Sequence, residues 1–356
     1  MFMVKILIDF YRLKDKHSGL GYFSSQLARF FLSNKMSKKM DLTFLVPEPF
    51  AADYKGKCST RVHRFYNRIM PKGLYNYDIW HSTSQFPNIL PKKNKSLFIL
   101  TIHDLNFLFE KTPFKQKKYK RRLQRLVNRA DVITAISHFT KSTIEEHLLL
   151  KGKVVEVIYN GVDSPSIYAP KKPTWIQDTP FFFSLGFFTK KKNWEPIIRM
   201  MTQFPSYKLV ISGFNETSYG DFCKDLISEL NLEDRVILSG KISNEEKSWF
   251  FENCSAFLFP SKAEGFGMPA VEAMTMGKPT FLSTHTSLPE IGGNVAFFFQ
   301  SFDIDHMTKI VKEGLAAYAS NKEMHEHKIK EHAKKFNWQT ASTAYLSLYE
   351  RLLSKK

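Results

Sequence analysis

The sequence predicts an α/β protein with two domains, each built on a parallel sheet, and three observations support this. The 356 residues exceed the size of one ordinary domain. Hydrophobic residues make up 43% of the chain, which is enough for two full cores. Short apolar runs of strand length alternate with helical segments, a pattern typical of parallel sheets. No run reaches about 18 apolar residues, so we expect no membrane-spanning helix.

The first half of the chain supplies several of these units in order. Runs with the composition of buried strands occupy residues 4–10, 42–46, 79–81 and 97–102. An amphipathic helix is predicted at 22–31, because Phe23, Leu27, Phe30 and Phe31 form an apolar stripe at helical spacing.

Gly19 and Gly21 lie between the first predicted strand and that helix. Glycines before a helix let backbone N–H groups approach a phosphate, although two glycines can also simply turn the chain. A nicotinamide-dependent oxidoreductase would share this loop. It would also need a third glycine where the sequence has Ser24, so this class is disfavoured.

The net charge of +18 calls for an anionic partner, and residues 111–129 hold nine basic residues and no acidic one. Helical spacing places Tyr119, Leu123, Leu126 and Ala130 on one face of this segment. Because no nucleic-acid-binding motif accompanies it, anionic lipid or a lipid-diphosphate acceptor is favoured over nucleic acid. A solvated basic helix face is the alternative. The residues of this basic patch are Lys117, Lys118, Lys120, Arg121, Arg122 and Arg125.

His103 and Asp104 directly follow the strand predicted at 97–102. Open α/β sheets bind ligands at the carboxyl ends of their strands, which makes this a candidate position. A lone histidine at a strand end is nevertheless more often structural than catalytic, and Asp104 is expected to orient the loop.

Proline and polar residues at 164–180 indicate a linker between a first domain, 1–163, and a second, 181–335. Predicted strands follow at 180–186, 207–212, 236–238, 255–259 and 280–283. Lys190, Lys191 and Lys192 come between the first of these strands and a helix that starts at Trp194, which suits a phosphate, or a solvated lysine cluster. A last helical stretch runs from about Ala333, and residues 336–356 are predicted to form a C-terminal helix.

The stretch 259–293 contains the residues that most strongly indicate a ligand-binding site. Glu264 precedes Gly265-Phe266-Gly267, Pro269 suits a first helical position, and Glu272 lies on the helix that follows. Backbone N–H groups at such a helix start attract an anion, and carboxylates accept bonds from hydroxyls, so a ligand with phosphate and several hydroxyls fits. The alternative is that Glu272 complements the helix dipole and Glu264 is a solvated loop charge.

The string E-G-F-G-M-P-x-x-E-A-M-x-x-G-x-P, with S-L-P-E after it, resembles the donor-site motif of retaining glycosyltransferases of family 4, "glycosyl transferases group 1". T-I-H-D at 101–104 and N-G-V-D at 160–163 also match this family's pattern. The resemblance implies the GT-B fold: two Rossmann-like domains with parallel sheets facing an interdomain cleft, and a C-terminal helix that crosses back to the first domain.

The same resemblance implies roles for individual residues. Glu264 and His103 would be catalytic, with His103 against the donor sugar. One departure concerns the diphosphate, because many relatives have arginine directly after the glycine where this chain has Phe187. The implied donor-binding residues are Gly19, Gly21, Lys191, Lys192, Ile242, Gly265, Phe266, Gly267, Met268 and Glu272.

The implied reaction is transfer of a hexose, with retention and by front-face substitution, from a nucleoside-diphosphate sugar. GDP-mannose is favoured as donor over a UDP-hexose, because the motifs are similar to those of bacterial O-antigen and capsule enzymes. The acceptor would be a saccharide or a lipid-diphosphate-linked sugar in the synthesis of lipopolysaccharide or another surface polysaccharide. No metal and no cofactor are expected.

The expected location is the cytoplasm, with peripheral contact to anionic lipid at the inner face of the cell membrane and no nucleic acid as partner. Three widely spaced cysteines, Cys58, Cys223 and Cys254, suit a reducing compartment. The alternatives in function are a non-catalytic subunit that binds a sugar nucleotide, and a basic nucleic-acid-binding protein, which would leave the two glutamates unexplained.

Overall fold

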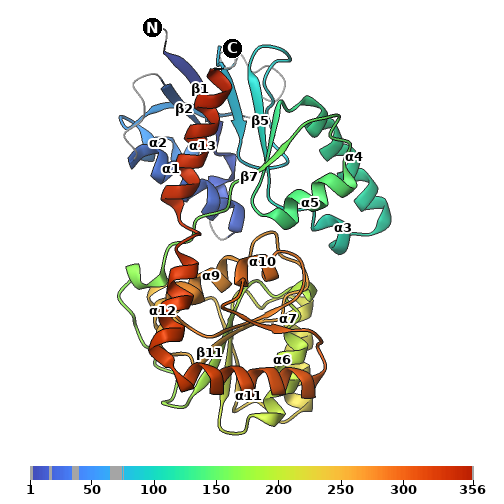
Figure 1. Ribbon diagram of the computed structural model, residues 1–356, viewed down its shortest axis with the longest axis vertical. Coiled ribbons are helices and arrows are strands. Elements are labelled where there is room, and N and C mark those ends of the chain that lie inside the picture. Colours follow the sequence, from blue (N-terminus) through green and yellow to red (C-terminus); the bar gives the residue numbers. More distant parts are fainter. Residues whose placement is uncertain (1–2, 16–17, 34–39, 65–73, 75, 355–356) are drawn as a thin grey trace. The chain divides into compact units, whose positions relative to one another are not determined.

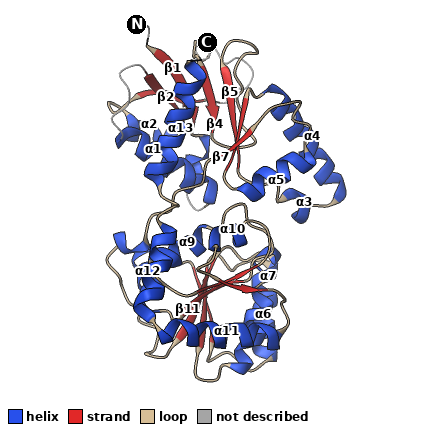
Figure 2. Cartoon of the chain, in the orientation of Figure 1, coloured by secondary structure: helices blue, strands red, loops and turns tan. Residues whose placement is uncertain are grey.

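The computed structural model describes residues 3–15, 18–33, 40–64, 74 and 76–354 (Figure 1). The chain forms two compact units, Met1–Gly161 together with Trp338–Lys356, and Val162–Asn337. In each unit a parallel sheet lies between layers of helices (Figure 2). The predicted α/β class with two parallel sheets is confirmed.

The first unit contains a seven-stranded sheet in the order β3-β2-β1-β4-β5-β6-β7. β3 was not predicted, because its sequence STRVH alternates exposed and covered residues on an edge strand and lacks a continuous apolar run. The strands are β1 Val4–Asp9, β2 Met40–Pro47, β3 Ser59–His63, β4 Ile79–Ser82, β5 Leu97–Ile102, β6 Val132–Ala135 and β7 Val155–Val157.

Helices cover both faces of this sheet (Figure 2). The helix predicted at 22–31 begins earlier, at Gly19, because the side-chain oxygen of Ser18 accepts the Gly21 amide at 3.0 Å and caps the first turn. The apolar face predicted for the basic helix is confirmed, since Leu123, Leu126 and Ala130 are buried. The helices are α1 Gly19–Ser33, α2 Ala51–Tyr54, α3 Phe107–Glu110, α4 Pro113–Arg129, α5 His138–His147 and α13 Trp338–Leu353.

The C-terminal helix α13 belongs to the first unit and packs against α1, as expected from the GT-B resemblance. Trp338 and Tyr345 lie in the same core as Phe23, and the Tyr349 hydroxyl lies 2.6 Å from Nδ1 of His81. The helical stretch predicted from about Ala333 starts later than expected, because α12 ends at Ala333 and α13 starts at Trp338, where the chain passes between units. Residues 355 and 356 lie outside the described residues.

The second unit contains a six-stranded parallel sheet in the order β10-β9-β8-β11-β12-β13. Its strands are β8 Phe181–Leu185, β9 Lys208–Ser212, β10 Val236–Gly240, β11 Ala256–Phe259, β12 Thr280–Ser283 and β13 Phe297–Phe299. Its helices are α6 Trp194–Met200, α7 Ser218–Glu229, α8 Asn244–Asn253, α9 Met268–Thr275, α10 Leu288–Gly292, α11 Ile304–Ser320 and α12 Lys322–Ala333.

Each sheet has one topological switch point, where the strand order reverses. In the first unit it lies between β1 and β4, and in the second between β8 and β11. Open parallel sheets bind ligands at the carboxyl ends of the strands on either side of such a point. The loops after these four strands are therefore the first places to look for a site. Among the helices that the structure describes, none combines the length and the apolar character needed to cross a membrane.

Candidate functional site

Two predicted residues meet at the switch point of the second sheet. Lys192 follows β8 and Glu264 follows β11, and the Lys192 ammonium lies 2.6 Å from Oε1 of Glu264. Both side chains are nearly buried, with 10% and 13% of their surfaces exposed. Each charge therefore depends on the other for compensation, since an isolated charge at this depth is costly.

The lysine is held in place by its own loop. It lies in a 3₁₀ turn, Lys190–Lys192, and its ammonium stands 4.5 Å from the centre of the Phe259 ring. A Cβ at Gly186 would lie 2.8 Å from Cε of Lys192, so a larger residue there would displace the end of the lysine side chain. Asn193 then turns the chain into α6 with a left-handed backbone, at φ 57°. The main chain of Lys191 is bound as well, because its carbonyl accepts the Lys262 amide at 2.7 Å.

The glutamate is fixed by three hydroxyl groups. Ser261 donates to Oε1 of Glu264 at 2.7 Å, and the Glu264 amide donates to Oγ1 of Thr286 at 3.0 Å. The Ser287 hydroxyl, fully buried, lies 3.1 Å from the Glu264 carbonyl and 2.9 Å from that of Phe266. The carboxylate is therefore positioned through both its side chain and its main chain.

The glycine loop after Glu264 leads directly into α9. Gly267 has φ 103°, which other residues rarely adopt, and stands at the N-cap of the helix that Met268 and Pro269 begin, as predicted. Phe266 is buried, and its ring meets that of Phe336 at 5.5 Å. The loop is thus anchored by the Phe266 ring and turned into α9 by Gly267.

Glu272, one turn further along α9, has a partner that the sequence did not indicate. Its Oε1 lies 2.7 Å from the ammonium of Lys247 on α8, and the side chain of Glu272 is 9% exposed. The sequence showed no link between the two, because they lie 25 residues apart in the chain and on different helices.

The ends of β8, β9 and β10 meet beside this site through glycines. A Cβ at Gly213 would lie 1.9 Å from the Gly186 carbonyl, and the Gly213 amide donates to Gly240. Phe187, where the resemblance implied an arginine, is 53% exposed and stacks on Phe214 at 5.2 Å. Close to Phe214, the next turn begins with Lys241, whose ammonium stands 5.0 Å from the Phe214 ring, and continues to Ile242, which is half-buried.

The remaining predicted residues of the site belong to the first unit. His103 follows β5, and its Nε2 lies 2.8 Å from the carbonyl of Thr83, which follows β4 at the switch point. Burial lowers the pKa of His103 to about 4, so the ring is neutral at pH 7. The Phe23 ring meets it edge-on at 4.7 Å.

The two glycines of the first unit differ in their surroundings. Gly19 is exposed at the start of α1. Gly21 is buried; a Cβ there would lie 2.1 Å from the Asp15 carbonyl, and its amide already donates to Ser18. Close packing against Asp15 is thus a sufficient reason for glycine at 21, and a phosphate contact by either glycine remains a prediction.

Asp9, at the end of β1, was missed by the sequence reasoning. Its carboxyl is buried, and this burial raises its pKa to about 7, although the amide of Tyr11 donates to Oδ1 at 3.0 Å. The Asp9 carbonyl accepts the hydroxyl of Thr83, which places it beside the His103 loop. The available signal was its position at the end of the first strand.

The basic patch lies on α4 of the first unit. Its six residues are exposed, and the guanidinium of Arg122 stands 4.9 Å from the Phe86 ring. Phe114, in the first turn of α4, is 80% exposed.

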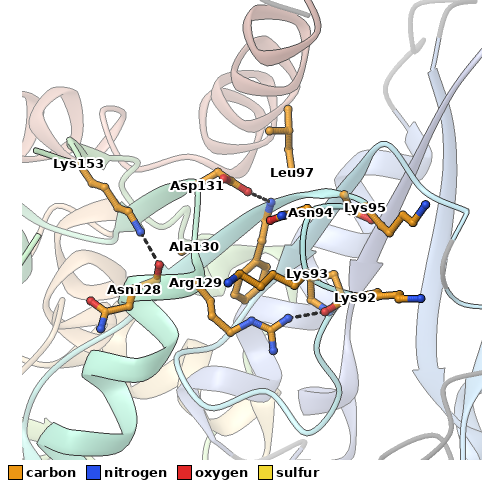
Figure 3. Close-up of a pocket in the computed structure, with 13 residues that line it drawn as sticks. Lys92, Lys93, Asn94, Lys95, Leu97, Asn128, Arg129, Ala130, Asp131 and Lys153 are labelled. Carbon is orange, nitrogen blue, oxygen red and sulfur yellow. Dashed lines mark hydrogen bonds between the residues drawn. The ribbon is translucent and has the colours of Figure 1, made fainter. Parts of the chain in front are cut away.

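A cavity of about 600 Å³ lies beside the amino ends of β5 and β6, whereas the switch-point loops of this sheet follow the carboxyl ends of its strands (Figure 3). Lys153 closes one side by donating to the Asn128 carbonyl at 2.9 Å, and Arg129 donates to the carbonyl of Pro91. Lys92, Lys93 and Lys95 also line it. Because ligands of open parallel sheets bind at the carboxyl ends, this cavity is separate from the candidate site.

The arrangement in the second unit can bind a ligand that combines phosphate and hydroxyl groups. Lys192 offers a buried cation, and Glu264 and Glu272 offer hydrogen-bond acceptors. Within the described residues, no cluster of three histidine, cysteine or acidic side chains could hold a metal ion.

Comparisons with known proteins identify the family and the fold of the chain. A model of "Glycosyl transferases group 1" matches residues 168–336, and a model of "Glycosyltransferase Family 4" matches residues 36–164, so together they span most of the chain. The solved sucrose-phosphate synthase of Thermosynechococcus elongatus has the same fold, with a TM-score of 0.78 at 17% identity, over 99% of this chain and 100% of that one.

Two curated relatives are mannosyltransferases. The "Serotype-specific mannosyltransferase WbdA" of Escherichia coli is 26% identical over 77% of this chain and 34% of its own length. The "O-antigen chain mannosyltransferase RfbU" of Salmonella typhimurium is 27% identical over 57% of each chain. The chain thus spans about a third of WbdA and just over half of RfbU. With both family models matched in order on the GT-B fold, the chain belongs to glycosyltransferase family 4.

Proposed function

We propose that this chain is a retaining hexosyltransferase whose donor is a nucleoside-diphosphate sugar. The observation that carries the proposal is the buried pair of Lys192 and Glu264 at the switch point of the second sheet. A donor offers a partner to each member of this pair. Its diphosphate can take the place of the carboxylate beside Lys192, and its sugar hydroxyls can donate to Glu264.

In the proposed reaction, the bond from the anomeric carbon to the diphosphate oxygen breaks while the acceptor oxygen bonds to the same face of that carbon. The acceptor proton passes to the departing diphosphate. Lys192 and the amides before α9 stabilise the negative charge on the leaving group, and no metal takes part. Glu264 stabilises positive charge on the anomeric carbon, Glu272 accepts bonds from ribose hydroxyls, and His103 contacts the sugar.

For the donor we favour GDP-mannose, because both relatives described above are named as mannosyltransferases. A UDP-hexose is the second candidate. For the acceptor we favour a saccharide or a lipid-linked sugar in surface polysaccharide synthesis, in line with the printed O-antigen name of one relative. Such an acceptor would place the protein against anionic lipid at the inner face of the cell membrane.

The test is a thermal-shift panel of the purified protein with GDP, UDP, ADP and their hexose conjugates, with and without a chelator. A ligand at a hundred times its Kd stabilises a protein by about 2.7 kcal/mol, which gives a clear shift. We expect the nucleotides of one base to raise the melting temperature, by the same amount with and without chelator. Lys192→Ala should abolish this shift. Lys328→Ala, an exposed lysine in the same unit, is the matched control. No shift with any nucleotide would contradict the proposal.

A second candidate, a non-catalytic sugar-nucleotide-binding subunit, is favoured by one feature. Phe187 stands where many relatives have an arginine, and it stacks on Phe214 instead of offering a cation. Release of nucleoside diphosphate from the donor that shifts the melting point separates the two. Release that depends on Glu264 supports the transferase, and tight binding without release in the presence of saccharide and lipid-linked acceptors supports the binding subunit.

A further inference from the structure

The two glutamates of the candidate site in the second unit are each paired with a lysine. Glu264 is paired with Lys192, and Oε1 of Glu272 lies 2.7 Å from the ammonium of Lys247. Lys192 has a role of its own beside the diphosphate in the proposed reaction, whereas Lys247 has none there. The second lysine therefore needs a separate explanation.

The position of Lys247 is unfavourable for a lysine in two respects. It lies in the first turn of α8, where its amide donates to the Ser243 carbonyl at 2.9 Å, and the positive end of a helix dipole disfavours a cation. Its side chain is also only 20% exposed, although lysine usually keeps its charge in water. The Glu272 carboxylate offsets both costs, so the pair accounts for a lysine at this position.

The helix that carries Lys247 is itself fixed in place. At its start, the Ser243 amide donates to the Glu246 carboxylate at 2.8 Å, and the Glu246 amide donates to the Ser243 hydroxyl oxygen at 3.1 Å. On its inner side, the ring of Phe250 is buried and stacks on that of Phe183 in β8 at 5.0 Å. A helix held at its start and along its inner side presents the lysine from a defined place.

The ion pair selects one orientation of the Glu272 side chain. A glutamate has several rotatable bonds and therefore several rotamers, and a charge-assisted bond to one oxygen favours one of them. An ionised carboxylate has about four acceptor positions, of which the ammonium takes one. The others suit two hydroxyls on neighbouring carbons, such as the 2′ and 3′ hydroxyls of a ribose.

We infer that Lys247 is a positioning residue, which holds the Glu272 carboxylate in the orientation that accepts the ribose hydroxyls. It thereby sets the preference of the site for ribonucleotides over deoxynucleotides. The inference deepens the proposed function and rests on it, because that function assigns the ribose to Glu272. Lys241 and Ile242, which the resemblance places near the base, directly precede α8, so the same ion pair links the base side of the site to the ribose side.

The test compares the affinities for two ligands by titration calorimetry: the nucleoside diphosphate that shifts the melting temperature most, and its 2′,3′-dideoxy form. The wild type should bind the ribonucleotide at least about tenfold more tightly, the factor that one hydrogen bond to a charged group contributes. Lys247→Met should lose most of this preference by weakening the ribonucleotide, while the dideoxy form binds as in the wild type. Lys247→Arg keeps a cation and should retain most of the preference.

The matched control is Lys309→Met on α11, which breaks an exposed ion pair with Glu313 in the same unit and should change neither affinity. Glu272→Gln shows whether Lys247 acts through Glu272. This variant should lose most of the ribose preference, and adding Lys247→Met to it should lower the preference no further. Where Lys247→Met lacks a cooperative melting transition, Lys247→Gln, which is shorter and neutral, takes its place in the same titrations.

Equal weakening of both ligands by Lys247→Met would overturn the inference, because a contact with the diphosphate or a general loss of structure has that effect. An unchanged preference in Lys247→Met, or a further loss in the double variant, would overturn it as well. Failure of the proposed function gives a different result, since the wild type would then bind no nucleotide and both proposals would fall. Nucleotide binding without a ribose preference would remove the role of Lys247 alone and leave the donor site in place.

Discussion

The ammonium of Lys192 lies 2.6 Å from Oε1 of Glu264, and the two side chains come from loops 72 residues apart that meet at the switch point of the second sheet. Because both are nearly buried, neither can lose its partner without replacement. A donor diphosphate would supply one replacement and the donor sugar the other. Opening of this pair is therefore coupled to donor binding in the proposed reaction.

Glu264→Gln should reduce turnover by at least about 100-fold, the scale on which removal of one electrostatic group acts. The amide keeps the size of the side chain and the bond from Ser261, so a cooperative unfolding transition should remain. Single-turnover release of nucleoside diphosphate measures the effect. Glu313→Gln, on the exposed side of α11, is the control, and normal release in Glu264→Gln would remove this residue from the mechanism.

Lys192→Met and Glu264→Gln should be strongly non-additive in stability. Each single change leaves a buried group without its partner, whereas the double change removes both charges. The coupling free energy should be about 0.5–3 kcal/mol, the range for residues in contact. Urea unfolding of the four proteins measures it, and coupling near zero would show that the pair does not stabilise the empty site.

Ser287→Ala should lower both stability and turnover. Its buried hydroxyl is the donor for the carbonyls of Glu264 and Phe266, and unsatisfied buried groups cost about 1–3 kcal/mol. Turnover should fall more than nucleotide affinity, because the misplaced group is the Glu264 carboxylate. Ser320→Ala removes a comparable bond on an exposed helix end and should change neither. Equal effects in the two variants would contradict a positioning role.

Asp9→Asn should change how stability depends on pH. The buried Asp9 keeps its proton up to a pKa of about 7, whereas the unfolded chain releases it near 3.8. The wild type should therefore lose stability relative to the variant as pH rises from about 4 to 7, then stay level. Burial also lowers the pKa of His81 to about 3 and of His103 to about 4, which favours unfolding as pH falls below 6.5.

The comparison at each pH removes the histidine contribution, because both proteins contain His81 and His103. Thermal unfolding from pH 4 to pH 8 provides the measurement. A constant difference between wild type and Asp9→Asn across this range would show that Asp9 is ionised in the folded state.

Much of the fold could be predicted from the sequence because parallel strands are buried on both faces. A strand such as β5 is a continuous apolar run, and its predicted bounds 97–102 match the structure. The start of α1 was misplaced, since glycine is a poor helix former and the capping role of Ser18 depends on a local turn. The break before Trp338 has no glycine or proline to mark it.

The candidate site divides in the same way. Glu264 and Lys192 stand in contiguous motifs and were predicted, and the structure joins them. Lys247 was missed because its contact with Glu272 joins two helices, and no local pattern marks it. The positioning role of Ser287, which belongs to the S-L-P-E motif, was not predicted, because its two acceptors lie more than twenty residues earlier in the chain.

The first unit is assembled from both ends of the chain. A Cβ at Gly161 would lie 2.2 Å from the Trp338 nitrogen, so the loop that leaves this unit after β7 and the start of the helix that re-enters it lie side by side. During translation, the whole of Val162–Asn337 leaves the ribosome before Trp338, Tyr345 and Tyr349 can reach the core that they share with Phe23. The second unit, Val162–Asn337, can therefore fold first. Until Trp338–Lys356 has been synthesised, the first unit exposes an apolar face to which chaperones can bind.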